Sequence, residues 1–535
     1  MKKFIPLFFL LVTSLFAQDK NIDVLNYSLS MDFSNNFKPM SNYTYTATEV
    51  IKIKALNDIG SFSLNANNSS LKIESVSIGG ISFVHNKDEL VIYLDKTYLQ
   101  GEEFEVGISY SHKNFFDSAF YVGREIIYTD CEPEGARCWY PSKDFPDDKA
   151  HFEIKAKVPA NILFASNGTL TDSLSDGKFT TYTWKSIYPI ATYLVAFVGS
   201  ANYKLKVIDW KNPVTQENIP IRFYYQKNDN LKKLDEMMAA VPQMMDYFTE
   251  VFGIYPFEKL GFATVDNQFP WGGMENQTII TLCPDCWNED LLAHELAHHW
   301  FGDLISPTRW SDIWLNEGFA TYAETIWAEK MYGKNQYRSI NQSNANLYLI
   351  SNPGRPIYNK AWDSIVPSND TLFNVAMTYN KSGAVLYMLR YVLGDSLFFS
   401  TIKNYATNPD LMHKNINTSK FVNLVSEYAG RDMTWFFEQW LYRPNHPVYE
   451  NRYEIKKDGD EWKVTFNIKQ TQREEFFKMP VELQIMFQKN KEIVRLENQY
   501  NNQTFELNFK EKPVFVEFDP NSGIILKKAR TVQGF

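Results

Sequence analysis

The stretch "HELAHHWFGDLISPTRWSDIWLNEGFATYAE", residues 294–324, decides how the whole chain is interpreted. Its first part has the composition of a helix, and residues four apart on an α-helix are rotated by about 40° from each other. His294 and His298 therefore project from one face and can reach a single ion. Two histidines at this spacing are weak evidence by themselves. Glu295 between them and the "NE" pair at the start of a second helix add what a catalytic zinc ion needs.

The third metal ligand is expected on the second helix. A zinc ion in a hydrolase takes three protein ligands and leaves a fourth position for water. Gly302 and Pro307 let the chain turn between the two helices, so Glu317 of "WLNEGFATYAE" is the best candidate for that ligand. The sequence therefore predicts one Zn²⁺ per chain, bound by His294, His298 and Glu317, although cobalt or manganese could occupy the same ligands in vitro.

Two more glutamates of this stretch have expected roles around the metal. Glu295 adjoins the first ligand and is predicted to be a general base, taking a proton from a water molecule whose pKa the metal lowers towards ~7. Glu324 lies two helical turns after Glu317, on the same face, where it can orient a ligand histidine. A solvated helix glutamate is the alternative interpretation of Glu324.

Composition indicates a folded chain of several domains. At 535 residues, three or four domains of about 150 residues each are expected. Apolar residues are 44 % and charged residues 22 %, as in globular proteins, and the 16 % of aromatic residues suits β-rich packing and large concave surfaces. The net charge of -9, with no basic block, argues against a nucleic-acid-binding protein.

Hydrophobic periodicity divides the chain into three parts. Segments such as "YTYTATEVIKIKAL" and "HFEIKAKVPA" alternate at strand length between residues 22 and 205. "LKKLDEMMAAVPQMMDYFTEVFG" then has helical spacing and stops at Gly253, and further helical segments follow through residue 440. After the prolines of "RPNHPVYE" the alternation returns, with "DGD" as a hairpin turn. The predicted domains are 18–205 (β), 206–445 (mostly helical) and 446–535 (a small β-sandwich).

The first residues are predicted to be a secretory signal peptide, residues 1–17. Lys2 and Lys3 precede the apolar run "FIPLFFLLV", and Ala17 is a suitable cleavage point. An N-terminal strand of the fold is the alternative. The run is shorter than the ~20 apolar residues of a membrane span, and no later segment is apolar enough, so no transmembrane segment is expected in the mature chain. The expected location is periplasmic or extracellular.

Export makes the cysteines disulfide candidates. The four are Cys131, Cys138, Cys283 and Cys286, which allow three pairings. "CPDC" alone could also be a redox-active pair or half of a zinc site, but there is no second such motif and no thioredoxin-like context. A structural disulfide is the preferred interpretation, and its pairing stays open.

With "HELAHHW" and "WLNEGFATYAE", the chain resembles the gluzincin metallopeptidases of the aminopeptidase N family. "WGGMENQ" is similar to that family's glycine-rich strand motif, "CEPEGARCWYPSKDFP" to its N-terminal-domain motif, "YPIATYLVAFVG" to its closing strand and "TYNKSGAVLYML" to its tyrosine motif. The resemblance runs from about residue 25 to 447. It implies a multidomain α+β fold: an N-terminal β-sandwich or saddle domain, a thermolysin-like, mostly helical catalytic domain, and a C-terminal β-sandwich.

The resemblance also implies roles for five residues outside the zinc helices. Tyr379 matches the tyrosine that stabilises the oxyanion of the tetrahedral intermediate. Glu275 and Glu132 match the carboxylates that bind the free α-amino group of a peptide, which explains why an internal peptide bond would be rejected. The backbone of Gly272 and Gly273 would bind the extended substrate as an added strand, with a β-bulge as the alternative for the glycine pair.

The chain departs from the family pattern in three places. Gly273 stands where alanine is usual, which should loosen the strand, and Ser142, Lys143 and Phe145 replace the usual residues of one loop. Many members carry a long helical C-terminal domain, whereas about 90 residues follow Pro447 here, enough for one sandwich. This short form predicts a more open active-site cleft.

These patterns together predict an exported zinc aminopeptidase whose partners are peptides with a free N-terminus; the oligomeric state and preferred residue stay open. One alternative is a catalytically silent peptide-binding protein on the same fold, although all five of His294, Glu295, His298, Glu317 and Tyr379 are present. Relatives with bifunctional epoxide hydrolase activity are a second alternative, but their extra cationic residues lie in the helical domain that this chain lacks. An endopeptidase is a third, against which Glu132 and Glu275 argue.

Overall fold

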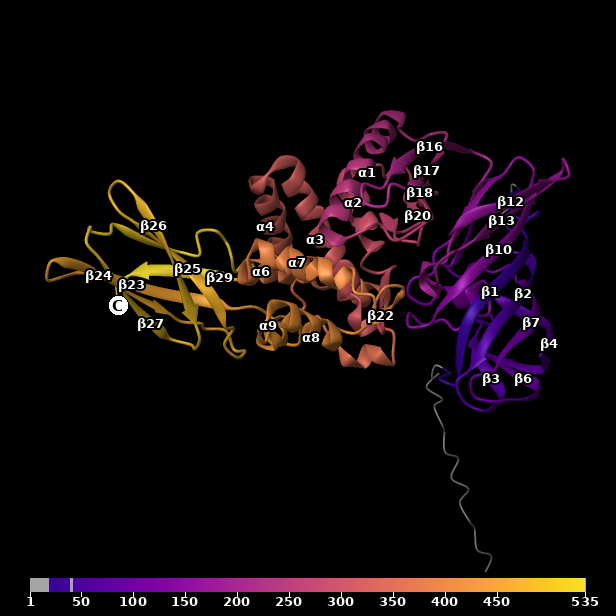
Figure 1. Ribbon diagram of the computed structural model, residues 1–535, viewed down its shortest axis with the longest axis horizontal. Helices are drawn as coiled ribbons and strands as arrows, with labels where there is room; N and C mark the ends of the chain where they lie inside the picture. The colour runs from indigo at the N-terminus through magenta and orange to yellow at the C-terminus, as the bar shows by residue number, and fades with distance from the viewer. Residues whose placement is uncertain (1–18, 39–41, 535) are drawn as a thin grey trace, which may run out of the picture.

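The computed structural model describes residues 19–38 and 42–534, which form three domains in a row (Figure 1). A β-rich N-terminal domain lies at one end, a mostly helical domain in the middle and a second β domain at the other end. The predicted multidomain α+β class is therefore confirmed. The signal peptide predicted over residues 1–17 lies outside the described residues.

Three sheets build the N-terminal domain. The strands of the largest sheet are β1 (Ile22–Asp32), β2 (Tyr45–Ala55), β4 (Leu71–Ile78), β7 (Glu103–His112), β10 (Lys149–Pro159), β12 (Thr169–Ser175), β13 (Phe179–Lys185) and β14 (Ile190–Ala191). The other two sheets contain β3 (Ile59–Asn65), β5 (Gly80–Asn86) and β6 (Glu89–Tyr98), and β8 (Phe120–Gly123), β9 (Ile126–Thr129), β11 (Leu163–Ser166) and β15 (Phe197–Ser200). Two 3₁₀ turns, η1 (Ala136–Cys138) and η2 (Thr192–Leu194), complete the domain.

The order of the largest sheet is β12-β13-β10-β1-β2-β7-β4, with β14 beside β10. β1 pairs in parallel with β10 and antiparallel with β2. Buried and more exposed residues alternate along β2 and β10, as the period of two in their sequences predicts. The four-stranded sheet has the order β11-β15-β9-β8, and Tyr128 Oη on β9 donates to Oδ1 of Asp266 in the middle domain at 2.9 Å. The residues that follow β9 therefore reach the functional site described below.

The middle domain begins with a five-stranded sheet. Its strands are β16 (Tyr203–Lys211), β17 (Asn218–Gln226), β18 (Leu260–Thr264), β19 (Gly273–Met274) and β20 (Ile280–Leu282), in the order β16-β17-β18-β20-β19. β17, β18 and β20 are parallel, whereas β19 is antiparallel to β20. Among the described strands, β19 thus forms the edge of the sheet and has no partner on its other side.

The helices of the middle domain follow the predicted segments. They are α1 (Leu231–Phe252), α2 (Glu289–His298), α3 (Trp314–Tyr332), α4 (Lys334–Ser351), α5 (Asn369–Leu372), α6 (Ser382–Leu393), α7 (Asp395–Ala406), α8 (Thr418–Ala429) and α9 (Thr434–Leu441). Short elements join them: η3 (Trp310–Asp312), η4 (Lys360–Asp363), the π-helix η5 (Val375–Lys381) and the pair β21 (Ile305–Pro307) and β22 (Lys414–Ile416). α1 ends as predicted before Gly253, whose φ of 109° suits glycine. None of the described helices is long and apolar enough to cross a membrane.

The C-terminal domain is the predicted β-sandwich. One sheet contains β23 (Val448–Asp458), β24 (Glu461–Ile468), β27 (Gln503–Phe509) and β29 (Lys528–Gln533), and the other β25 (Met479–Met486), β26 (Lys491–Asn498) and β28 (Phe515–Phe518). Phe518 of one sheet packs on Tyr449 and Phe466 of the other, at ring centroid distances of 5.0 and 6.3 Å. The predicted hairpin turn is present, with Gly459 at φ 60° between β23 and β24.

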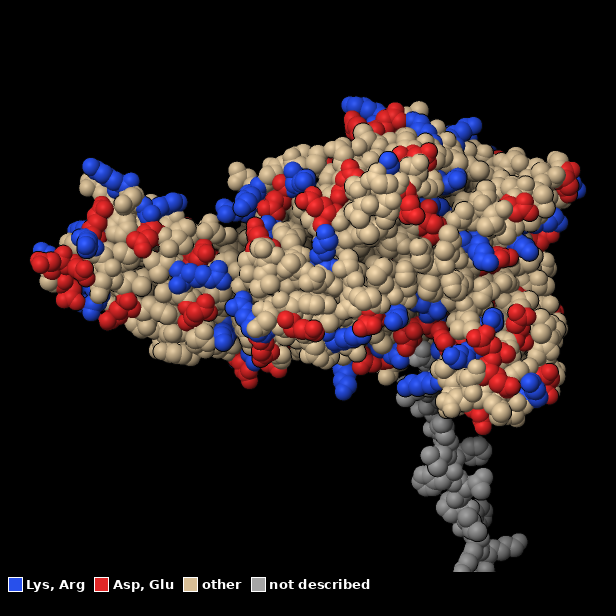
Figure 2. All heavy atoms as spheres, viewed as in Figure 1, with Lys and Arg blue, Asp and Glu red and all other residues tan. Residues whose placement is uncertain are grey.

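Apolar packing and buried hydrogen bonds join the N-terminal and middle domains. Val265 and Trp310 of the middle domain belong to the hydrophobic core of the N-terminal domain. Lys149 Nζ on β10 donates to the carbonyl oxygen of Asp303 at 2.6 Å, and Tyr193 Oη donates to that of Gly302 at 2.9 Å. These contacts hold the N-terminal domain against the segment that follows α2. On the face shown in Figure 2, charges of both signs are interspersed over all three domains.

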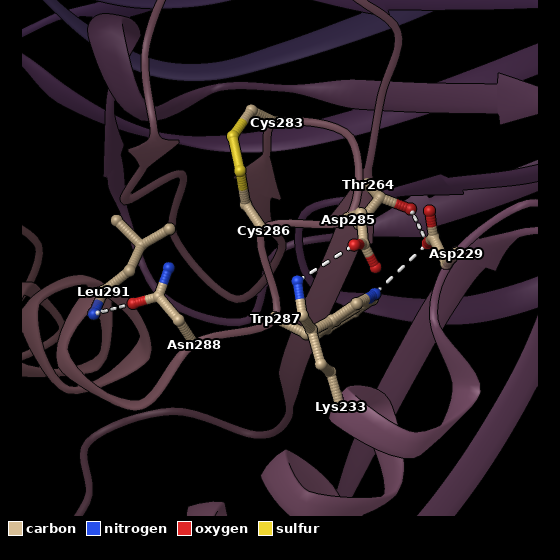
Figure 3. The surroundings of a disulfide bond; sticks show 9 residues. All are labelled: Asp229, Lys233, Thr264, Cys283, Asp285, Cys286, Trp287, Asn288 and Leu291. Carbon is tan, nitrogen blue, oxygen red and sulfur yellow. Dashed lines mark hydrogen bonds and ion pairs between the residues drawn. A yellow bond between two sulfur atoms is a disulfide. The ribbon is translucent and has the colours of Figure 1, made fainter.

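One disulfide lies just before α2 (Figure 3). Of the four cysteines, Cys283 and Cys286 are bonded to each other, whereas Cys131 and Cys138 are buried thiols. Cys131 Sγ instead donates to the carbonyl oxygen of Val195 at 3.2 Å. Of the four disulfide candidates, only the "CPDC" pair is therefore bonded, and the other two sulfurs are buried in the N-terminal domain.

Candidate active site

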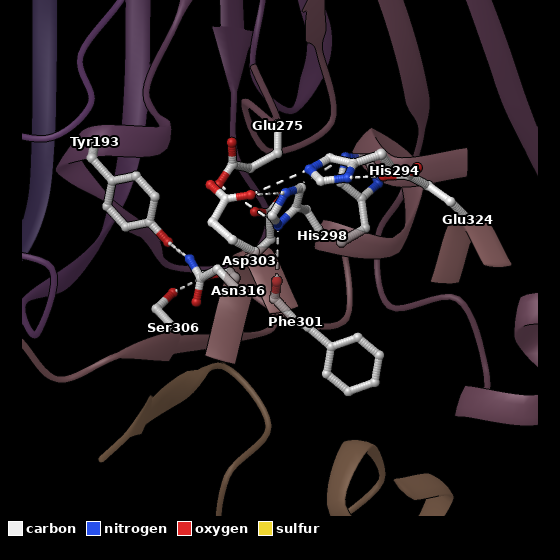
Figure 4. Close-up of polar contacts among 12 residues, drawn as sticks. Tyr193, Glu275, His294, His298, Phe301, Asp303, Ser306, Asn316 and Glu324 are labelled. Carbon is white, nitrogen blue, oxygen red and sulfur yellow. Dashed lines mark hydrogen bonds and ion pairs between the residues drawn. The ribbon is translucent and has the colours of Figure 1, made fainter. Parts of the chain in front are cut away.

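The two histidines of α2 face one carboxylate of α3, that of Glu317. Figure 4 shows His294 and His298 next to each other, with Glu324 on the far side of His294. α2 is capped at its start by Asn288, whose side chain accepts a hydrogen bond from Leu291 N at 2.9 Å. The rings of His294 and His298 lie 4.8 Å apart between centroids. Their Nε2 atoms lie 3.2 and 3.4 Å from the same atom, Oε2 of Glu317. The structure thus brings together the three residues that the sequence predicted as metal ligands.

Hydrogen bonds on the far side of each ring fix its orientation. His294 Nδ1 donates to Oε1 of Glu324 at 2.6 Å, and His298 Nδ1 donates to the carbonyl oxygen of Phe301 at 3.1 Å. When a metal ion takes the place of the second proton, the remaining proton stays on Nδ1 and the lone pair of each Nε2 points towards the metal. Glu324 is therefore placed to orient a histidine and is not a solvated helix residue.

This donor set fits a zinc ion. Two neutral imidazoles and one carboxylate, with ligand atoms within 4.8 Å of one another, are typical of a catalytic zinc site. Burial alone would raise the pKa of Glu317, but the positive charge of protonated His298 and the hydrogen bonds from His294 and His298 outweigh burial and lower it to about 2. Glu317 is therefore an anion, as a metal ligand must be.

Glu295 lies on the same face of the pocket but is not among the ligands. Its side chain is buried, and burial raises the pKa of its carboxyl group to about 8 against the opposing effect of His294 and His298. Gly273 of β19 packs directly on it, since a Cβ added at Gly273 would lie 2.3 Å from Oε1 of Glu295. Glycine at position 273 therefore does more than loosen the strand: the Glu295 carboxyl group occupies the space that an alanine methyl group would need.

Two further carboxylates approach the metal ligands from different domains. Glu132 follows β9 of the N-terminal domain, and Glu275 follows β19. One oxygen of each, together with one of Glu317, lies in a group whose atoms are all within 4.8 Å of one another. Burial, and then the charges of Glu275 and Glu317, raise the pKa of Glu132. Oε1 of Glu132 and Oε1 of Glu275 are buried and accept no hydrogen bond from the described residues.

The open edge of β19 completes this side of the pocket. The strand register places Gly273 opposite Leu282, and just before the strand Cys283 N donates to the carbonyl oxygen of Gly272 at 2.9 Å. Hydrogen-bonded and non-hydrogen-bonded pairs alternate along an antiparallel ladder, so the N–H and C=O of Gly273 face away from β20. Of the two glycines predicted to bind a peptide backbone, Gly273 has its groups free for it, whereas the Gly272 carbonyl is already used within the sheet.

Tyr379 lies on the π-helix η5, at the other side of the histidines. Its ring centroid is 6.0 Å from that of His294, and the two rings are stacked. Burial, and then the carboxylates of Glu317 and Glu132, raise the pKa of its hydroxyl group, so Tyr379 is a neutral phenol that can donate a hydrogen bond. Single π-helical turns within helical segments are often found at functional sites.

A cavity of about 500 Å³ connects all these residues. Its apolar wall contains Trp271 and Phe373, whose ring centroids are 6.3 Å apart, and Trp271 Nε1 donates to Oδ2 of Asp130 at 3.0 Å. The sequence did not predict this wall. Trp271 is the first residue of the "WGGMENQ" motif and could have been suspected from it, but Phe373 and Asp130 belong to no motif that assigned them a role.

Comparison with known proteins agrees with this geometry. The model of the peptidase family M1 domain matches residues 236–440, and that of the peptidase M1 N-terminal domain matches residues 24–194. Aminopeptidase 2 of Candida albicans is 26 % identical over 496 residues, which cover 84 % of this chain and 51 % of that protein. Aminopeptidase N of Lactococcus lactis is 25 % identical over 403 residues, covering 70 % of this chain and 46 % of that protein. The chain thus spans about half the length of these curated relatives.

A solved structure shares the fold. The M1 zinc metallopeptidase of Deinococcus radiodurans superimposes with a TM-score of 0.69 at 21 % identity, covering 79 % of this chain and 94 % of that one. At this identity the likeness establishes the architecture of the domains around the pocket. The roles of the individual pocket residues rest on the geometry described above.

Proposed function

Because the chain belongs to peptidase family M1, we propose that it is a zinc-dependent aminopeptidase, which hydrolyses the first peptide bond of a peptide with a free N-terminus. The observation that carries this proposal is the pair Glu132 and Glu275 beside the group His294, His298 and Glu317. Each of the two has a buried oxygen that accepts no hydrogen bond from the described residues. An α-ammonium group would supply the missing donors and the missing positive charge, and an internal peptide bond would not.

A peptide fits the pocket as an additional strand. Backbone hydrogen bonds to Gly273 on the open edge of β19 would align it, as in other complexes where an extended peptide joins a sheet edge. Its α-amino group would then lie between Glu132 and Glu275, and the first carbonyl group would lie beside the histidine pair. Because the α-amino group and the first carbonyl group occupy these two places, only one residue fits before the bond that is cleaved. The enzyme is therefore an exopeptidase.

His294, His298 and Glu317 would hold the zinc ion, which when bound polarises the scissile carbonyl group and makes a water molecule more acidic. Glu295 takes a proton from the attacking water and passes it to the leaving amine. The neutral phenol of Tyr379 donates a hydrogen bond to the carbonyl oxygen as negative charge develops there. Glu324 and the Phe301 carbonyl keep the imidazoles in the orientation that the reaction needs.

The test is hydrolysis of a panel of aminoacyl chromogenic amides next to their N-acetylated counterparts, with and without a chelator and with zinc added back. Cleavage of the free-amine compounds alone, abolished by chelator and restored by zinc, is the expected result. Equal cleavage of acetylated compounds would contradict the role of Glu132 and Glu275. An absence of cleavage by zinc-loaded protein would instead favour a peptide-binding protein.

We also propose that the chain is exported and digests peptides in the periplasm or outside the cell. The charged and apolar pattern of residues 1–17 supports export, and the disulfide between Cys283 and Cys286 is typical of an oxidising compartment. Cell fractionation with N-terminal sequencing tests this. A mature protein that begins after Ala17 outside the cytoplasm is expected, and a cytoplasmic protein that retains Lys2 and Lys3 would contradict it.

A further inference from the structure

The pocket contains more carboxyl groups than one zinc ion uses. Of the residues that the structure describes, five glutamates line the cavity and no lysine or arginine does: Glu132, Glu275, Glu295, Glu317 and Glu324. Glu317 and the two histidines are occupied by the predicted zinc ion, and Glu324 is bonded to His294. Among the described residues that line the cavity, Glu132 and Glu275 have no lysine or arginine partner when no peptide is bound.

The geometry of these two carboxylates resembles that of a cation site. Oxygen atoms of Glu132, Glu275 and Glu317 lie within 4.8 Å of one another, although the residues come from the N-terminal domain, the end of β19 and α3. Glu275 is only 3 % exposed, it lines the cavity, and its Oε1 accepts no hydrogen bond from the described residues. His298 Nδ1 lies 3.8 Å from Oε1 of Glu275 but already donates its proton to the carbonyl oxygen of Phe301. A buried oxygen in this position lacks a partner.

The donor chemistry selects the kind of cation. The group of Glu132, Glu275 and Glu317 offers oxygen atoms alone, whereas the zinc group adds two imidazole nitrogens. Carboxylate oxygens without nitrogen or sulfur suit hard divalent cations such as Mn²⁺, Mg²⁺ and Ca²⁺. Glu317 belongs to both groups and has two oxygens, so it can serve both at once.

We propose that Glu132, Glu275 and Glu317 bind a second, hard divalent cation of the Mn²⁺ type in the zinc-loaded protein, and that a peptide's α-ammonium group displaces it. Cation and ammonium occupy the same carboxylates, so the two compete. The competition rests on the proposed function, whereas the binding of the cation does not. Hard divalent cations then act as competitive inhibitors, whose effect disappears at high peptide concentration.

The experiment is a titration of the full chain, loaded with one zinc ion, with Mn²⁺, followed by the electron paramagnetic resonance signal of free Mn²⁺. One Mn²⁺ should bind per chain while metal analysis still finds one zinc. Glu132→Gln and Glu275→Gln should each weaken Mn²⁺ binding by roughly tenfold or more, because each removes a charged ligand. Glu427→Gln, at an exposed position on α8, is the control and should leave binding unchanged.

Displacement of bound Mn²⁺ by an amine tests the cation site separately from the proposed peptidase activity. Leucine amide should release the bound Mn²⁺, and N-acetyl leucine amide should not. The proposal is wrong if Mn²⁺ does not bind to the zinc-loaded protein, if it binds only by replacing zinc, or if both glutamine variants bind it as wild type does while retaining zinc. If Mn²⁺ binds as expected and no aminoacyl amide is cleaved, the cation site stands and the peptidase proposal fails.

Discussion

Two regions of the molecule contain buried carboxylates without partners, and they differ in what surrounds them. In the pocket, Glu132 and Glu275 line a cavity of about 500 Å³. In the N-terminal domain, Glu49 on β2 is 1 % exposed, and neither of its oxygens accepts a hydrogen bond from the described residues. The pocket carboxylates have room for a ligand beside them, whereas Glu49 is enclosed by packed side chains.

The comparison shows that an unpaired buried charge is evidence of function only where a ligand can reach it. Burial and the carboxylate charges around it raise the pKa of Glu132, and burial alone raises the pKa of Glu49. The free-energy cost of burying a carboxylate is therefore compensated differently in the two regions. A cation or an ammonium group can compensate the pocket pair, but only a proton can compensate Glu49. Four variants test this difference, beginning with the largest expected effect on catalysis.

Glu295→Gln should have the largest effect. An amide cannot accept the proton of the attacking water, and general-base catalysis contributes roughly 10²- to 10⁴-fold, so kcat should fall by about 10³-fold. Zinc content should stay at one per chain because Glu295 is outside the ligand group His294, His298 and Glu317. Steady-state kinetics with parallel metal analysis measures both. A variant that loses zinc, or retains more than about a tenth of the wild-type kcat, would show that Glu295 has another role.

Glu275→Gln tests the pocket side of the comparison directly. Losing one of two carboxylates around the α-ammonium group should reduce kcat/KM for free-amine substrates by about 10²-fold, the cost of breaking a buried charge pair. The same variant should raise the melting temperature of the metal-free protein, since it removes an uncompensated buried charge. Calorimetry and kinetics on one preparation provide both values. A variant that loses activity and also unfolds more easily would indicate that Glu275 is structural.

The zinc helix and the domain order follow from the sequence because both depend on local periodicity. Spacing alone places His294 and His298 on one face, and composition alone ends α1 at Gly253. The alternation along "YTATEVIKIKA" also places Glu49 in phase with the buried Tyr45 and Ile51, so its burial could have been predicted from the sequence.

The remaining parts of the site depend on tertiary contacts that no local pattern contains. Glu132 reaches the pocket only because the N-terminal domain is held against the segment after α2, and the family resemblance, not periodicity, indicated its role. Gly273 lies on an edge strand, β19, that is only two residues long. A strand this short cannot be recognised in a sequence. Likewise, Asp130 and Trp271 meet across the domain boundary, at 3.0 Å.

Glu324→Gln should have a smaller effect, on metal affinity. The amide can still accept a hydrogen bond from His294 Nδ1 but lacks the charge that makes the imidazole more basic, so zinc should bind about 10-fold more weakly. With excess zinc, kcat should be close to that of wild type. Competition with a chelator of known affinity measures the change. An unchanged zinc affinity would show that the contact of 2.6 Å between Glu324 and His294 does not tune the site.

Glu49→Gln should leave kcat and KM unchanged and alter only how stability depends on pH. The carboxyl group of Glu49 has an ordinary pKa of 4.5, and burial raises it well above that value in the folded protein. The folded state therefore holds a proton that the unfolded state releases above pH 4.5, so stability is lost as pH rises from about 5 towards the folded pKa. The loss is at most about 1.4 kcal/mol per pH unit, and glutamine, which does not titrate, abolishes it.

The readout for Glu49→Gln is the urea midpoint of unfolding at pH 5 and pH 8, with hydrogen exchange of the β2 amides to assign the change to this domain. Relative to wild type, the urea midpoint of Glu49→Gln should be higher at pH 8 than at pH 5. Glu105→Gln, at an exposed position on the neighbouring strand β7, is the matched control and should run parallel to wild type. If the urea midpoint of Glu49→Gln depends on pH as that of wild type does, Glu49 has a cationic or hydrogen-bonding partner after all. The N-terminal domain would then resemble the pocket, and the contrast between a reachable and an enclosed carboxylate would be lost.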